Sequence, residues 1–263
     1  MEEWISKGLE INNRIRPRTP PVAVKLLKDM REMPEGVMRP VKDFGGRMLI
    51  CQAITIAREY GYTIGLTYED TKGLCPGPIL FGWGELEDET DIAKAWLEGK
   101  RFPDLETAKK TLDSLPRFEK GEYAGMIVSP IEKANLVPDV IVVYCNPAAV
   151  MVLIIASIYK RGGQLTFVST GLCGCLNEII RPILDGEPNA IIPGIGEKLH
   201  ARTQDDEMAF SIPREKLSEI IEGFKCSRDI RYPVTITSLV TPIPLPIKVP
   251  AEVFPPYKTM SWK

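Results

Sequence analysis

Six cysteines are the residues whose type and spacing point most directly to chemistry in this 263-residue chain. They are Cys51, Cys75, Cys145, Cys173, Cys175 and Cys226. A single histidine, His200, accompanies them, which excludes histidine-rich zinc sites and mechanisms that need two histidines. Soft thiolate ligands dispersed over several loops, without histidine, favour an iron–sulfur cluster over catalytic zinc. We therefore expect a cluster, with zinc as the alternative cofactor.

Four of these cysteines, Cys51, Cys75, Cys173 and Cys175, are the expected metal ligands. Cys51 falls in the first turn of a predicted helix, where the local dipole favours a thiolate. Cys75 lies in a turn-rich loop with Gly77, and such a backbone can wrap a cluster and offer amides to its sulfurs. Cys173 and Cys175 form a Cys-Gly-Cys motif, which can bind one metal or cluster, or act as a redox pair.

The remaining polar candidates are less specific. Glu69, Asp70 and Glu207 are the candidate acid/base groups, although most carboxylate runs are only solvated. Asn146 precedes a proline at the predicted start of a helix, where it would cap the helix. With Gly77, it is the candidate contact for a bound cofactor.

Two cysteines and the histidine have plainer interpretations. Cys145 either joins the site from the end of its strand or is a buried structural thiol. Cys226 follows an amphipathic helix with no companion nearby, so we expect it to be structural. His200 stands in a polar stretch and is expected at the surface.

A glycine-leucine-cysteine triplet occurs twice, at residues 73–75 and 171–173, each time after a segment typical of helix and then strand. The repetition predicts two related half-domains, each of which brings thiols to the same kind of edge. A chance match between short motifs is the alternative.

Periodicity predicts alternating strands and helices. Strands are expected at 21–27, 62–68, 123–128, 140–144 and 164–169, and helices at 50–57, 91–98, 104–115, 147–159, 172–183 and 213–224. This alternation predicts a layered α/β fold with a partly parallel sheet. Ligands of such sheets collect beyond the carboxyl ends of strands, where Glu69, Asp70, Cys75, Cys145, Ser169, Thr170 and Cys173 fall.

The organisation along the chain follows from composition. We expect a first α/β half at 1–84, a charged helical excursion outside the core at 85–122, and a second half at 123–232. Residues 233–263 contain seven prolines among apolar residues, which forbid helix and interior strand. This arm must be extended, and its apolar side chains need a groove on its own chain or on a neighbouring subunit.

Bulk composition limits the partners. Apolar content of 44%, charged content of 26% and a net charge of −2 are ordinary for a soluble globular protein. They give no reason to expect nucleic acid or an anionic membrane as partner. The opening residues lack the profile of a signal peptide, and the longest apolar stretch is too short to span a bilayer. We expect a cytoplasmic protein with reduced thiols.

These residues resemble a family known as domain of unknown function 169, found in archaea and in anaerobic or metabolically versatile bacteria. The resemblance covers roughly 21–223 and rests on dispersed positions: Pro21–Leu26, Cys51, Ala57, Gly61, Glu69, Asp70, Cys75, Gly77, Asn146, Pro147, Gly163, Cys175, Ile179–Pro182, Asn189, Pro193, Gly196, Asp206, Glu207 and Ser211–Pro213. No activity comes with the family name.

The resemblance implies that Cys51, Cys75 and Cys175 are the family-type thiols. Many members carry a further cysteine directly after the proline that corresponds to Pro193, where this chain has Gly194. The fourth ligand would then be Cys173 or Cys145. Alternatively, a three-thiolate cluster leaves one iron open to act as a Lewis acid on substrate.

The leading hypothesis is an iron–sulfur protein, of 4Fe-4S type, that serves electron transfer or Lewis-acid chemistry on a small metabolite. Its partners would be a small-molecule substrate or a redox partner protein, and we expect a homo-oligomer. The first rival is a non-catalytic, zinc-stabilised binding protein. The second is a thiol redox protein that uses Cys173 and Cys175.

Overall fold

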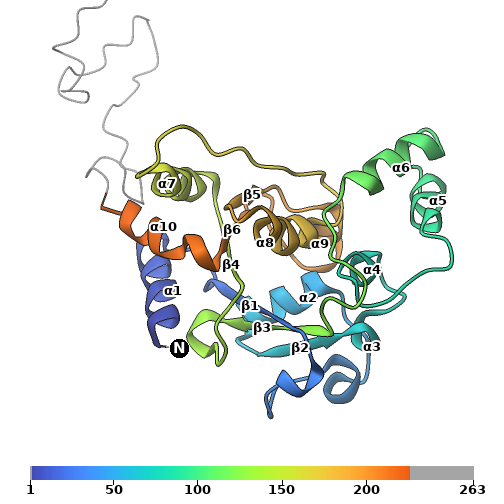
Figure 1. Ribbon diagram of the computed structural model, residues 1–263, viewed down its shortest axis with the longest axis horizontal. Coiled ribbons are helices and arrows are strands. Elements are labelled where there is room, and N and C mark those ends of the chain that lie inside the picture. Colours follow the sequence, from blue (N-terminus) through green and yellow to red (C-terminus); the bar gives the residue numbers. More distant parts are fainter. Residues whose placement is uncertain (1, 226–263) are drawn as a thin grey trace, which may run out of the picture.

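The computed structural model describes residues 2–225 and has a mixed α/β architecture built on one sheet (Figure 1). The six strands lie in the order β2-β3-β1-β4-β6-β5. Their bounds are β1 Val22–Leu27, β2 Ile64–Thr67, β3 Gly125–Pro130, β4 Val140–Cys145, β5 Asn189–Ile191 and β6 Met208–Pro213. The central strand β4 is buried at every position and β1 at every position except Lys25, as expected for a sheet covered on both faces.

The predicted partly parallel sheet is wrong, because every pair of neighbouring strands is antiparallel. β1 pairs with both β3 and β4, so a strand from the start of the chain lies between two from its second half. It follows that β2 and β4 run in opposite directions. The carboxyl ends of these two strands therefore lie at opposite ends of the sheet.

One predicted strand is absent. Residues 164–169 form no regular secondary structure. The main chain of Val168 bonds instead to the Asn189 side chain, with its N–H 3.0 Å from Oδ1 and its carbonyl oxygen 3.2 Å from Nδ2. The amide of Asn189 thus takes the place of a neighbouring strand, and the second copy of the internal repeat lacks the strand of the first.

Helices cover both faces of the sheet. On one face lie α2 (Ile50–Thr55), the π-helical turns η3 (Ile56–Tyr60) and η5 (Leu176–Ile180), α8 (Arg181–Asp185) and α9 (Ile195–His200). On the other lie α1 (Glu2–Ile15), α7 (Pro147–Ile158) and α10 (Leu217–Gly223). Because successive strand residues point to opposite faces, two hydrophobic cores result. The first core lies under α2 and η5, and the second under α1, α7 and α10.

The charged excursion contains two helices, α5 (Thr90–Glu98) and α6 (Leu105–Ser114), which confirms the predicted helices there. The two helices pack on each other at one end of the molecule (Figure 1). Trp96 and Leu112 of these helices are buried and belong to the first core. Short helices α3 (Tyr68–Thr71) and α4 (Gly77–Leu80) connect β2 to the excursion.

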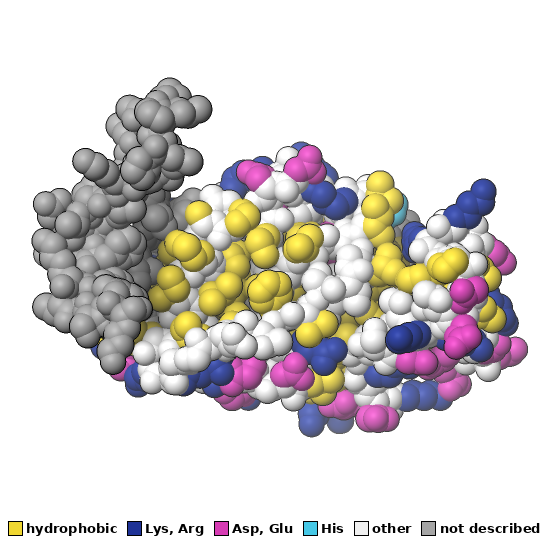
Figure 2. All heavy atoms as spheres, turned by 90° about the horizontal axis from the view of Figure 1, so that it is seen from above, with side chains coloured by type: hydrophobic (Ala, Val, Ile, Leu, Met, Phe, Trp, Pro, Cys, Tyr) yellow, Lys and Arg dark blue, Asp and Glu magenta, His cyan; other side chains and the backbone are white. Residues whose placement is uncertain are grey.

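Exposed apolar side chains gather on the face that carries α7 and residues 159–172 (Figure 2). Met151, Phe167 and Val168 are each more than two-fifths exposed. Within residues 2–225, no helix is long and apolar enough to cross a bilayer. The proline-rich arm and Cys226 lie outside the described residues.

Candidate functional site

Four thiols from separate segments converge on the first core side of the sheet. Cys51 lies in the first turn of α2, Cys75 precedes α4, and Cys173 and Cys175 lead into η5. Cys175 is the centre of the group, since Cys51, Cys75 and Cys173 all lie near enough for their charges to raise its pKa. The structure thus brings together the four cysteines predicted as metal ligands.

Gly77 lies directly beside two of these sulfurs. A Cβ atom built on Gly77 would be 3.3 Å from the Sγ of Cys75 and 3.9 Å from the Sγ of Cys175. The missing side chain therefore lets the main chain of Gly77 lie close to both thiols. The glycine predicted to contact a cofactor lines the thiol site itself.

Burial dominates the electrostatics of the thiols. It raises the pKa of Cys51, Cys75 and Cys175, and that of Cys173 to about 12. Burial of Cys51 opposes the effect of the helix dipole, because desolvation penalises the charged form of the thiol and raises its pKa. Neutral thiols release their protons when a metal binds, so any metal held by these thiols would bind in a pH-dependent way.

Cys173 has an unusual backbone. Its φ of 48° lies in the left-handed region, which is costly for a residue with a Cβ atom. Such conformations cluster at ligand-binding and catalytic sites, where the surrounding fold holds them in place. Arg101 is the cation that acts on this thiol, and it lowers the pKa slightly against the larger effect of burial.

Glu197 is the site residue that the sequence did not reveal. It lies in the first turn of α9, it is 1% exposed, and its Oε1 accepts a hydrogen bond of 3.0 Å from the Cys175 amide. Its Oε2 is buried and makes no hydrogen bond of normal geometry with any described residue. Burial raises the pKa of Glu197, and the nearby backbone N–H groups oppose that rise. An acidic residue in a first helical turn is too common to mark a site by pattern alone.

Two glycines admit the Glu197 carboxylate. A Cβ atom on Gly174 would lie 2.9 Å from both carboxylate oxygens, and one on Gly194 would lie 2.8 Å from Oε2. No real side chain fits at these distances. Gly194 is the position at which the resemblance implied a cysteine in many relatives, and here the carboxylate occupies the adjacent space.

The cysteines and carboxylates described above do not form a site for a single metal ion. Among residues 2–225, no three His, Cys, Asp or Glu side chains are arranged to hold one metal ion.

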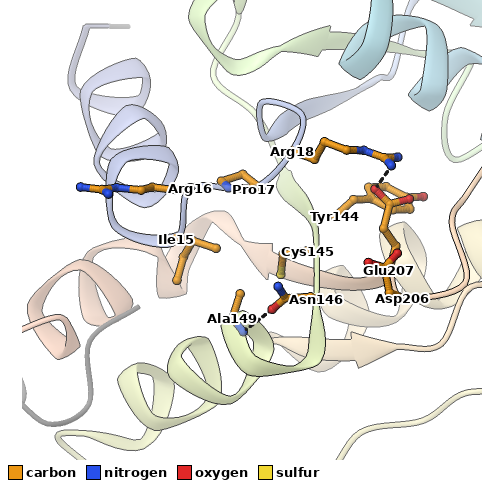
Figure 3. A pocket seen from close by; sticks show the side chains of 10 residues that line it. All are labelled: Ile15, Arg16, Pro17, Arg18, Tyr144, Cys145, Asn146, Ala149, Asp206 and Glu207. Carbon is orange, nitrogen blue, oxygen red and sulfur yellow. Dashed lines mark hydrogen bonds and ion pairs between the residues drawn. The ribbon is translucent and has the colours of Figure 1, made fainter. Parts of the chain in front are cut away.

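Cys145 is remote from this centre. Tyr144 and Cys145 are successive residues of β4 and point into different cores, with Cys145 in the second. Cys145 lines a cavity of about 220 Å³ with Asn146 and Glu207 (Figure 3). Asn146 caps α7 as predicted, with its Oδ1 3.0 Å from the amide of Ala149.

Glu207 is part of a buried ion pair at the wall of this cavity. Arg58 reaches it with both terminal nitrogens, at 2.9 Å and 3.1 Å, and Arg18 contacts it at 3.1 Å (Figure 3). Although burial acts to raise the pKa of Glu207, the hydrogen bonds from Arg58 and Gln204 outweigh it and lower the pKa.

The other two candidate acid/base carboxylates, Asp70 and Glu69, bind neighbouring side chains or main-chain groups. Asp70 is 1% exposed and accepts hydrogen bonds from Arg39 and from the amide and hydroxyl of Thr67. Glu69 is exposed and pairs with Lys72. His200 is exposed on α9, which confirms its expected place.

A buried polar network connects the cavity with the thiol centre. Tyr144 lines the cavity, and its hydroxyl donates to the carboxylate oxygens of Glu178 at 2.9 Å and 3.0 Å. The Arg58 guanidinium lies 4.2 Å from the centroid of the Tyr144 ring. Burial, followed by the charge of Glu197, raises the pKa of Glu178 to about 8. Glu178 could not be recognised from the sequence, because its partner Tyr144 lies on a distant strand.

Comparison with known proteins assigns the chain to a protein family. The model of the family named domain of unknown function 169, described as uncharacterised ArCR, matches residues 10–223. The chain belongs to this family. One relative is an uncharacterized protein of Methanocaldococcus jannaschii. It is 27% identical over 215 residues, which cover 80% of this chain and 89% of that protein. No solved structure matches the chain.

Proposed function

We propose that this protein of the domain of unknown function 169 family binds an iron–sulfur cluster, of 4Fe-4S type, through Cys51, Cys75, Cys173 and Cys175. The observation that carries the proposal is the position of the Cys75 and Cys175 sulfurs beside Gly77, with Cys51 and Cys173 near enough for their charges to act on Cys175. Four soft ligands from separate segments, without histidine, suit iron–sulfur chemistry.

The surroundings of the thiols fit such a group. The space at Gly77 adjoins two sulfurs, and the buried Oε2 of Glu197 has no partner of its own. Four neighbouring thiolates would repel one another in a buried site, so their deprotonated form needs a cationic guest. When bound, a cluster supplies an electron carrier or a Lewis-acidic iron for a small metabolite. The chain itself supplies the ligands, the excluded solvent and the neighbouring carboxyl groups.

Two rivals remain to be tested against this proposal. A structural zinc ion would use the same thiols and make the protein a binding module. A thiol redox protein would use Cys173 and Cys175, but a raised thiol pKa is the opposite of what a nucleophilic cysteine needs. A cytoplasmic location, a homo-oligomeric state and a redox partner protein belong to the proposal as well.

The deciding experiment is metal and sulfide analysis of protein purified without oxygen. We expect brown protein with comparable amounts of iron and acid-labile sulfide. Colourless protein with one equivalent of zinc would favour the binding module. Folded protein that takes up neither metal, even after anaerobic reconstitution with iron and sulfide, would overturn both metal hypotheses.

A further inference from the structure

We propose that the proline-rich arm, residues 233–263, binds along the outer face of α7 of its own chain. The outer face of α7 consists of the residues of this helix that are not buried: Pro147, Ala148, Met151, Ile154, Ile155 and Ile158. The inference does not depend on the metal site. It supplies the groove that the apolar side chains of the arm need.

The composition of α7 is the first support. The residues of its outer face recur at the spacing of one helical stripe, and none of them is polar. A surface helix ordinarily carries polar side chains on the face that points away from the core, whereas a helix that is apolar on all sides is a buried helix. The inner side of α7, with Val150 and Leu153, is apolar as well. α7 therefore has the sequence of a helix that is covered on both sides, although Met151 is 41% exposed.

The apolar surface continues past the end of the helix. Tyr159 directly follows the last residue of α7, and it is 49% exposed. Phe167 and Val168 belong to the segment that follows, on the face where exposed apolar side chains gather (Figure 2). Contiguous apolar surface of this kind is rare on soluble proteins unless it binds something.

The point at which the described chain ends is the second support. α10 packs directly on α7, since a Cβ atom on Gly223 would lie 2.1 Å from the carbonyl oxygen of Ala156. Glu222 also pairs with Lys160 at 2.6 Å, just after the end of α7. The chain therefore leaves α10 beside the apolar surface (Figure 1). A tethered segment is present at a high effective concentration, which favours the arm of the same chain over a second copy.

The length and composition of the arm are the third support. α7 has 12 residues and is about 18 Å long, whereas each residue of an extended proline-rich segment advances about 3 Å. Residues 233–263 are thus long enough to follow the whole helix. Residues 241–250 alternate proline with isoleucine, leucine and valine over much of their length. Because proline has no N–H group, such a segment can cover an apolar helix and bury few unsatisfied donors.

Limited proteolysis of the full-length chain tests where the arm binds. Trypsin cleaves after Lys248, and intact-mass spectrometry follows the product that ends there. The double variant Met151→Gln with Ile155→Gln should be cut at this site about tenfold faster than wild type or more, because cleavage requires an arm that has left the face. Leu199→Gln is the matched control, at an exposed leucine of α9 on the opposite side of the sheet. It should be cut at the wild-type rate.

Thermal unfolding of full-length variants gives a second test. Leu245→Ser with Ile247→Ser changes the arm, and Met151→Gln with Ile155→Gln changes the face. Each pair should lower the melting temperature by about 2–4 °C. All four substitutions together should lower it hardly more than one pair does, because both pairs remove the same contact.

Other occupants of the face predict other results. Equal cleavage after Lys248 in wild type and in the face variant, or additive losses of melting temperature, would overturn the inference. If protection of Lys248 is lost on dilution, the arm comes from a second copy, and binding within the chain is rejected. If the face variant halves the mass in solution without faster cleavage, a second copy covers α7 in place of the arm.

Discussion

At the scale of single residues, the proposed chemistry depends on buried thiols, whose neutral form is favoured by burial. Cys51 and Cys175 are nearly inaccessible, and desolvation is the main reason for their raised pKa. In such a place a thiol is either an inert core residue or a ligand. Metal analysis of single-cysteine variants distinguishes the two cases.

Replacing single thiols tests this directly. Cys51→Ala, Cys75→Ala and Cys175→Ala should each lose most of the bound iron, because an incomplete ligand shell exposes a cluster to loss. Cys145→Ala is the matched control, since Cys145 is equally buried but faces the second core. Iron determination on anaerobic samples gives the result. A full complement of iron in Cys75→Ala would reject the site, and we also expect no loss in Cys226→Ala.

The space at Gly77 gives a second residue-scale prediction. Gly77→Ala places a methyl group 3.3 Å from the Cys75 sulfur, at the start of α4. The substitution leaves all the cysteines in place. We expect the metal-free protein to keep its melting temperature and the iron content to fall at least twofold. Gly196→Ala is the control, since its methyl group would meet nothing within 4 Å. Equal iron in both variants would show that the space beside Gly77 is not used.

At the scale of elements, the two faces of the sheet have separate tasks. The face with α2, η5 and α9 carries the thiols and Glu197. The face with α1, α7 and α10 is a second core in which helices approach closely. Changes in the second core should therefore alter stability without altering the metal site.

Gly223 provides that test. A Cβ atom at Gly223 would lie 2.1 Å from the carbonyl oxygen of Ala156, so α10 packs on the main chain of α7. Gly223→Ala should lower the free energy of unfolding by about 1–3 kcal/mol, the usual cost of overpacking. Urea denaturation measures the change, and iron per folded chain should stay at the wild-type value. Loss of iron in this variant would mean that the two faces are coupled.

At the scale of the whole molecule, a buried ionisable group makes the free energy of unfolding depend on pH. The pKa of Glu178 is raised from 4.5 to about 8 in the folded protein, mainly by burial and next by Glu197. Between these values the folded chain holds a proton that the unfolded chain has released. Stability is therefore greatest below about pH 4.5 as far as this group is concerned, and it is lost as pH rises toward 8.

Glu178→Gln should remove this contribution. The wild-type free energy of unfolding should fall more steeply than that of the variant between pH 5 and 8, by up to about 1.4 kcal/mol per pH unit. Chemical denaturation of metal-free protein across that range measures both slopes. Glu132→Gln, at an exposed carboxylate, should follow wild type. Parallel curves for wild type and Glu178→Gln would contradict the raised pKa.

The proline-rich arm raises a second whole-molecule prediction. Residues 233–263 lie outside the described part of the chain, and their apolar side chains need a groove. If the groove belongs to another subunit, which the sequence alone favours, deletion after Arg231 should convert an oligomer to a monomer. If it belongs to the same chain, as proposed for the outer face of α7, deletion should lower the melting temperature without changing the mass in solution. Light scattering measures the mass in solution, and thermal unfolding measures the melting temperature. If neither changes, the arm does not bind in a groove of either kind.

Local sequence determined much of this protein. The periodicity at 91–98 and 104–115 specified α5 and α6, and Asn146-Pro147 specified the start of α7. Cysteine type and histidine scarcity singled out Cys51, Cys75, Cys173 and Cys175, which the fold brings together. These features depend on neighbouring residues in the chain or on side-chain chemistry, so they can be predicted from the sequence.

Only the tertiary structure decided how these pieces are arranged. Strand direction depends on pairing between distant segments, so the alternation of strands and helices suggested parallel pairs where antiparallel ones form. The amide of Asn189 displaced the expected strand at 164–169. Glu197 lies in the space left by Gly174 and Gly194, and a close approach between two segments about twenty residues apart has no pattern in sequence.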